Sequence, residues 1–105
     1  MWDALEERVR GGVGEDPEEM QKRIVSSRPP VYPPLAEKAG IEGVVRLQVR
    51  VGQDGRTEVL KVLQGEPVLA DAAIAAVSQW RYRPKLADGK PVSVISEVKI
   101  NFLLH

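Results

Sequence analysis

The sequence predicts an α+β fold in which a three-stranded antiparallel sheet carries two helices on one face. One stretch alternates apolar and polar residues with a period of two: Val45, Leu47, Val49 and Val51. A second repeats apolar residues at helical spacing: Leu69, Ala73, Ala76, Val77 and Trp80. A third alternates to the C-terminus: Val92, Val94, Val98, Ile100, Phe102 and Leu104.

Length and composition indicate one small globular domain and argue against catalysis. The chain has 105 residues, of which 43% are hydrophobic and 29% charged, with a formal net charge of zero. Zero net charge gives no general reason to bind nucleic acid. Because cysteine is absent and His105 is the only histidine, we expect no enzyme, no metal site and no cofactor.

Residues 1–28 differ in pattern from residues 29–105, so we expect a partly ordered arm followed by the domain. Glycines at 11, 12 and 14 interrupt any long element and favour a linker. Asp16–Pro17–Glu18–Glu19 is typical of a helix start, while Ile24–Val25 suits extended chain. Trp2, Leu5 and Val9 could share one helical face.

The domain begins with a stiff, extended entry and a short helix. Four prolines (29, 30, 33 and 34) bracket Val31 and Tyr32. Pro34 suits the first position of a helix that Gly40 can end, with Leu35 and Ala39 facing the core. We expect Tyr32 to pack on the sheet or the long helix, holding residues 29–34 beside the last strand.

The first two strands form a hairpin around the turn Gly52–Gln53–Asp54–Gly55. The returning strand, 57–64, alternates imperfectly. A β-bulge near Glu58–Val59 would restore the register and turn Leu60 and Val62 inward. A strand covered on both faces explains the pattern equally well.

The remaining elements fix the strand order. A helix from Val68 to about Trp80 crosses over, and Pro84 prevents its continuation. Asp88–Gly89 makes a turn into the last strand, which pairs antiparallel with the first, giving the order 2-1-3. The last strand is then an edge with open backbone groups from Ser93 to Asn101.

Three groups of residues have an ordinary structural interpretation. The carboxylates Asp54, Glu58, Asp71 and Asp88 form no ligand pattern and suit a solvated surface. The basic cluster Arg81, Arg83, Lys85 and Lys90 flanks Trp80 and Tyr82, whose rings suit the core better than an anionic polymer. On the edge strand, Glu97 and Lys99 either guard against unwanted pairing or face a partner.

The series of motifs resembles the TonB C-terminal domain family over about residues 29–105. The resemblance rests on these residues in order: Tyr32–Pro33, Ala36, Gly43–Val44–Val45, Asp54–Gly55–Arg56, Ala72–Ala73, Ala76–Val77, Trp80–Arg81–Tyr82–Arg83–Pro84, Gly89–Lys90–Pro91–Val92 and Asn101–Phe102. Several of these residues serve the fold, among them Gly55, Trp80, Tyr82 and Pro84. The resemblance implies the α+β fold more strongly than an activity.

The resemblance also implies a function. The chain would be a periplasmic module that is anchored in the inner membrane through a segment absent here. It would bind the TonB box of outer-membrane transporters by strand addition and couple them to the proton-motive force of the ExbB–ExbD motor. The partner-binding residues would be those of the arm and the edge strand: Tyr32, Pro33, Ser93, Ile95, Glu97, Lys99 and Asn101. Two edge strands could instead meet in a homodimer. An interaction or sensory domain of another membrane protein, binding a different periplasmic partner or the cell wall, is the alternative.

Overall fold

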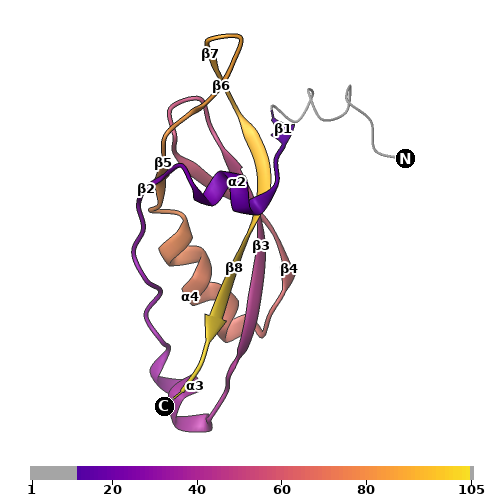
Figure 1. Cartoon of the computed structure of the whole chain (residues 1–105). Coiled ribbons are helices and arrows are strands. Elements are labelled where there is room, and N and C mark those ends of the chain that lie inside the picture. The colour runs from indigo at the N-terminus through magenta and orange to yellow at the C-terminus, as the bar shows by residue number, and fades with distance from the viewer. Residues whose placement is uncertain (1–11, 105) are drawn as a thin grey trace, which may run out of the picture.

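The computed structural model describes residues 12–104, which form an elongated α+β domain with a four-stranded sheet (Figure 1). The strands of this sheet are β1 (Val13–Gly14), β3 (Gly43–Val51), β4 (Thr57–Gln64) and β8 (Val94–Phe102). The helices are α2 (Pro17–Gln21), α3 (Pro34–Ala39) and α4 (Pro67–Val77). Short pairs join β2 (Ile24–Ser26) to β5 (Arg81–Tyr82) and β6 (Lys85–Ala87) to β7 (Lys90–Val92).

The strand order is β1-β8-β3-β4. The predicted 2-1-3 order corresponds to β4-β3-β8, whose neighbours pair antiparallel. The prediction of a three-stranded sheet is wrong by one strand, because β1 adds parallel to the outer side of β8. Two residues separated from β8 by most of the chain carry no periodicity, so local pattern could not reveal this pairing.

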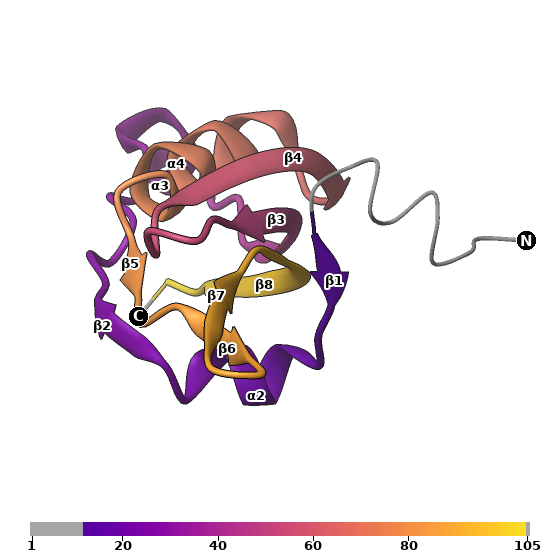
Figure 2. The same cartoon turned by 90° about the horizontal axis from the view of Figure 1, so that it is seen from above.

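The core lies between the sheet and α4. The alternating residues of β3 face it completely, since Val45, Leu47 and Val49 are each 0% exposed. The even-numbered face of β8 is buried as predicted, with Ile100 only partly so; Val98 and Phe102 belong to the same core cluster as Val77 and Trp80. Helices α3 and α4 lie on the same side of the sheet, as Figure 2 shows.

Helix α3 begins and ends as predicted but presents a different face. Pro34 is at its first turn and Gly40 ends it in the left-handed region, with φ of 69°. Ala36 is fully buried, however, while Leu35 is 77% exposed and Ala39 is exposed. The expectation that Leu35 and Ala39 face the core is wrong, because a helix of fewer than two turns is oriented by its tertiary contacts.

The irregularity of β4 lies further along than predicted. Val49 pairs with Val59 and Gln48 with Lys61, so Leu60 is the extra residue. A second shift at Leu63 follows, since Arg46 pairs with Gln64. Val59 packs against the core, whereas Leu60 and Val62 are about two-fifths exposed, which corrects the expectation that they point inward.

A short hairpin, β6–β7, precedes β8, and the sequence indicated it only through its turn. Asp88 and Gly89 have φ of 52° and 76°, which suits the two-residue loop between β6 and β7.

Helix α4 ends at Val77, three residues before Trp80. Over residues 12–104, no helix has the length and hydropathy needed to span a membrane.

Gly55 is required where the β3–β4 turn meets β5. Its φ is 82°, and a Cβ at this position would lie 2.0 Å from the carbonyl oxygen of Tyr82, whose amide donates to the Gly55 carbonyl at 2.9 Å. We expect Gly55→Ala to lower the free energy of unfolding by more than about 3 kcal/mol. Gly89→Ala is the matched control: its φ is 76° with nothing within 4 Å, so it should cost only about 1–2 kcal/mol. Urea unfolding measures both, and equal losses would contradict the close approach.

Removing the hydroxyl of Tyr32 and removing that of Tyr82 should have different effects on the free energy of unfolding. The Tyr32 hydroxyl donates to the Ile41 carbonyl, whereas the Tyr82 hydroxyl is buried without a hydrogen-bond partner in the described part of the chain. Burial raises the pKa of Tyr82 to about 12. We expect Tyr32→Phe to cost about 0.5–1.5 kcal/mol and Tyr82→Phe to be neutral or stabilising by about 1 kcal/mol. Thermal and urea unfolding test the pair, and a loss at Tyr82→Phe as large as at Tyr32→Phe would refute the assignment.

Candidate functional site: the outer edge of β8

The predicted partner-binding residues at the last strand direct their backbone amides and carbonyls to the same side of β8, away from β3. They are Ser93, Ile95, Glu97, Lys99 and Asn101. The carbonyls of Ser93 and Ile95 point away from β3, because they accept hydrogen bonds from residues on the opposite side. Backbone groups alternate in direction along a strand, so the amides and carbonyls of Glu97, Lys99 and Asn101 point the same way. We call this row of five residues the outer edge.

The first part of the outer edge is already paired. The Val13 amide donates to the Ser93 carbonyl and the Glu15 amide to the Ile95 carbonyl, each at 2.9 Å. The Ser96 hydroxyl donates to the Glu15 carbonyl at 2.7 Å. The expectation of an open edge from Ser93 onward is therefore wrong at Ser93 and Ile95, because the chain's own N-terminal segment covers them.

The second part of the outer edge has no strand beside it in the described chain. Next to it lies an open groove of about 400 Å³ between α2 and β8, lined by Pro17, Glu18, Gln21, Trp80, Glu97, Val98 and Lys99. Lys99 and Asn101 are exposed. The groove and the outward backbone groups lie side by side, which makes this stretch the candidate site.

The charged side chains of the outer edge differ in what they can offer. The Glu97 carboxylate accepts two hydrogen bonds from the Arg46 guanidinium, at 2.6 and 3.0 Å. That contact with Arg46, opposed by partial burial, lowers the pKa of Glu97. Lys99 makes no side-chain ion pair within residues 12–104, so its ammonium remains available to an incoming group.

A belt formed by residues 12–28 holds the covered part of the edge in place. It runs from β1 through α2 to β2, passing around the edge of β8 to reach β5 (Figures 1 and 2). The arm expected to be partly ordered thus has three short elements within its described residues; Trp2, Leu5 and Val9 lie outside them. Asp16 caps α2 as the sequence indicated, its carboxylate accepting from the Glu18 amide at 2.8 Å.

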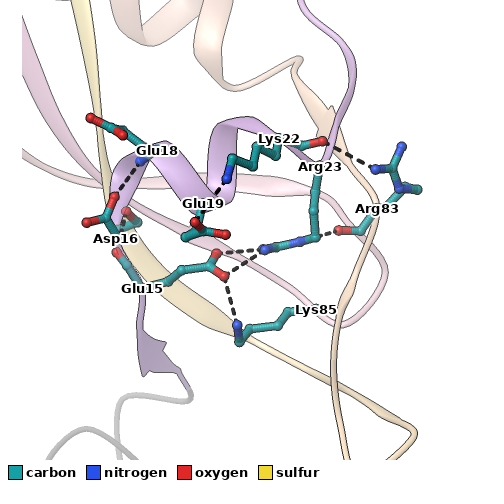
Figure 3. Close-up of polar contacts among 9 residues, drawn as sticks. Glu15, Asp16, Glu18, Glu19, Lys22, Arg23, Arg83 and Lys85 are labelled. Atoms are coloured by element: carbon teal, nitrogen blue, oxygen red, sulfur yellow. Dashed lines mark hydrogen bonds and ion pairs between the residues drawn. The ribbon is translucent and has the colours of Figure 1, made fainter.

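Glu15 anchors the belt electrostatically (Figure 3). Its carboxylate accepts two hydrogen bonds from the Arg23 guanidinium, both at 2.7 Å, and one from the Lys85 ammonium at 2.9 Å. The Glu15 side chain is 4% exposed. Burial alone would raise the pKa of Glu15, but the hydrogen bonds and charges of Arg23 and Lys85 outweigh it and lower that pKa.

Backbone and apolar contacts complete the anchor. Met20 of α2 is 1% exposed in the core cluster. Arg23 and Arg83 exchange contacts: the Arg83 amide donates to the Arg23 carbonyl at 2.7 Å, and the Arg23 side chain donates back to the Arg83 carbonyl at 3.1 Å. The Trp80 indole donates to the Arg28 carbonyl at 2.9 Å.

The predicted arm residues lie at the far end of the outer edge. The Tyr32 ring contacts the Phe102 ring edge-to-face, with centroids 5.5 Å apart, so Tyr32 packs on the last strand as expected. Pro33 precedes α3 as its cap residue. Pro29 and Val31 instead line a groove against α4, which corrects the expectation that residues 29–34 run beside the last strand.

The residues assigned to the structural motif meet around β5. Trp80 and Tyr82 are buried, and Pro84 separates β5 from β6. Three of the four basic cluster residues make polar contacts here: Arg81 with the Trp80 carbonyl, Arg83 with the Lys22 carbonyl and Lys85 with Glu15. Arg83 and Lys85 therefore contact the belt, whereas Arg81 contacts the residue just before β5. No group of three or more potential metal-ligating side chains occurs between residues 12 and 104.

The family model for the Gram-negative bacterial TonB protein C-terminal matches residues 28–104. The chain belongs to the TonB C-terminal family. Protein TonB of Pseudomonas aeruginosa is 37% identical over 67 residues, covering 62% of this chain and 20% of that protein. Protein TonB of Vibrio cholerae is 34% identical over 78 residues, covering 72% of this chain and 32% of that protein. The chain thus spans a fifth to a third of the length of these relatives.

A solved TonB domain has the same fold. The solution NMR structure of the Pseudomonas aeruginosa TonB C-terminal domain superposes with a TM-score of 0.59 at 28% identity, over 79% of this chain and 86% of that one. The family match begins at residue 28, so β1, α2 and β2 all precede it. All of the belt except residue 28 therefore lies before the region that the family model matches.

Sequence reasoning missed Glu15, Arg23 and Lys85 as a unit. Glu15 lies 8 residues from Arg23 and 70 from Lys85, so no local spacing connects them. The one available signal was the cap at Asp16–Pro17, which showed that an ordered helix follows Glu15 directly.

The Glu15 anchor predicts a specific pH dependence. Because the pKa of Glu15 is lowered in the folded chain, its contribution to stability is present above the ordinary value of 4.5 and is lost as the pH falls through the lowered pKa. At pH 7, Glu15→Gln should cost about 1–3 kcal/mol, and this difference should shrink steadily below pH 4.5. Urea unfolding between pH 7 and pH 3 measures it.

Glu19→Gln is the matched control for Glu15→Gln. Glu19 pairs with Lys22 on the exposed surface of α2, where its side chain is 60% exposed. Its substitution should change the free energy of unfolding by less than about 0.5 kcal/mol at every pH. A pH-independent cost at Glu15→Gln, or equal costs at both residues, would refute the anchor.

Proposed function

We propose that the chain is the periplasmic partner-binding module of a TonB-like energy transducer, and that it binds the TonB box of outer-membrane transporters by strand addition to β8. The observation that carries the proposal is the stretch of the outer edge at Glu97, Lys99 and Asn101, which lies beside a groove and pairs with no strand among the described residues. Membership of the TonB C-terminal family supports it. The chain acts as an adaptor without catalysis.

Backbone pairing sets the strength and the selectivity of this interaction. About five or six new hydrogen bonds at a net ~0.5–1.5 kcal/mol each give several kcal/mol. Ordering the free peptide offsets much of that gain, so the dissociation constant should be about micromolar. Because main-chain groups carry the recognition, most side-chain changes in the peptide should matter little.

The larger role follows from the whole protein rather than from this module. We propose that a segment outside this chain anchors the protein in the inner membrane and meets the ExbB–ExbD motor, which supplies energy from the proton-motive force. The full-length gene is the direct check: a single N-terminal anchor followed by a proline-rich spacer supports this role. Several membrane helices joined to a different domain would instead favour a sensory or cell-wall-binding protein.

The binding site is tested by NMR titration with a TonB-box peptide. We expect amide chemical-shift changes at Glu97, Lys99 and Asn101 and at the Trp80 indole. Replacing a central peptide residue by proline should abolish binding, because proline removes a donor and fixes φ, whereas alanine at that position should bind nearly as well. Shifts confined to β4, or none at millimolar peptide with a monomeric protein, would overturn the proposal.

A further inference from the structure

The belt occupies backbone positions that a partner strand would use. Of the five residues in the outer edge, Ser93 and Ile95 already accept hydrogen bonds from Val13 and Glu15. An extended segment pairing along the whole edge needs those two carbonyls as well as the groups of the three open residues. Only one strand can lie beside a given stretch of β8, so β1 and such a segment exclude each other.

Strand β1 is the weakly held part of the belt. It has two residues, and Val13 is 44% exposed. Glycines flank Val13 on both sides, and a glycine loses more conformational freedom on ordering than any other residue. Gly12 lies directly against Ile95, where an added Cβ would approach the Ile95 side chain to 2.6 Å. The pairing of β1 with β8 therefore depends on a glycine at position 12, and the glycines on both sides of Val13 also favour the unpaired segment.

The anchor lies immediately C-terminal to β1. The Glu15 carboxylate is buried with Arg23 and Lys85, Met20 is in the core, and the Arg28 carbonyl accepts from Trp80. None of these contacts involves Val13 or Gly14. These contacts hold the chain from Glu15 onward, so β1 can leave β8 while α2 and β2 stay docked, once the Glu15 amide also gives up its hydrogen bond to the Ile95 carbonyl.

We propose that β1 is an intramolecular occupant of the partner-binding edge, which a partner strand displaces when it pairs along the full length of β8. This inference rests on the proposed function, since it assumes that the outer edge receives a partner strand. A short partner confined to Glu97, Lys99 and Asn101 would leave β1 in place. A longer partner would have to replace the hydrogen bonds from the Val13 and Glu15 amides, so β1 lowers its affinity and sets the length that binds best.

The first test removes the competitor. Val13→Pro deletes the amide that donates to Ser93, and the matched control Val31→Pro makes the same change in the extended entry, at a 78% exposed residue whose amide makes no hydrogen bond in the structure. The probe is a TonB-box peptide long enough to reach Ser93. Loss of the one competing hydrogen bond from residue 13 should tighten its binding to Val13→Pro by about two- to tenfold. Val31→Pro should bind as the unchanged chain does.

The second test locks the competitor in place. Gly14 and Ile95 are paired in register, and the chain has no cysteine, so Gly14→Cys with Ile95→Cys allows one disulfide only. The oxidised protein should bind the long peptide about tenfold or more weakly than the same protein after reduction. A short peptide that pairs only with residues 97–101 of β8 should bind the oxidised and reduced proteins equally. In the unchanged chain, the long peptide should abolish exchange protection of the Val13 amide.

The outcomes separate the two proposals. If the long peptide binds but Val13→Pro and the oxidised protein both have the affinity of the unchanged chain, β1 is not a competitor and the proposed function stands. If the long peptide binds Val13→Pro but not the unchanged chain, β1 competes strongly enough to prevent binding. If no variant binds either peptide at millimolar concentration, the proposed function fails, and the inference fails with it.

Discussion

An edge strand leaves every second peptide group without a partner, and β8 meets this constraint in two ways along its length. Its inner side pairs with β3 from Val94 to Phe102. Its outer side is covered by the belt at Ser93 and Ile95, and beyond them no strand of residues 12–104 pairs with it. Exposed strand edges promote pairing with other chains, and the belt limits this tendency along the part of β8 that it covers. The proposed activity and the proposed competition both follow from this one strand.

The belt is stable because its anchor combines charge, burial and backbone pairing. A carboxylate as buried as that of Glu15 is tolerated only when its charge is balanced, and Arg23 and Lys85 do this from two different segments. The same contacts bring α2 to the side of β8, where Pro17 and Gln21 form one wall of the groove. The belt therefore shapes the open part of the site as well as covering the other part.

Local patterns determined the central elements of this protein from sequence. Alternation placed β3 and the buried face of β8, because one face of a half-buried strand must be apolar. Pro34 and Gly40 set the bounds of α3, and Asp88–Gly89 set the turn before β7, because these residues have strong backbone preferences. The chain connections then allowed few strand orders, and the family resemblance, which the family model confirms, rested on the same positions.

Tertiary structure alone decided what happens at the outer edge and at the ends of the short elements. Leu35 is exposed and Ala36 buried because the rest of the domain orients a short helix, and Leu60 is the bulged residue because β3 sets the register of β4. The pairing of β1 with β8 involves backbone groups that every residue has, so no side-chain pattern in the sequence predicts it. The Glu15 anchor joins residues 70 positions apart, and only the folded chain brings them together.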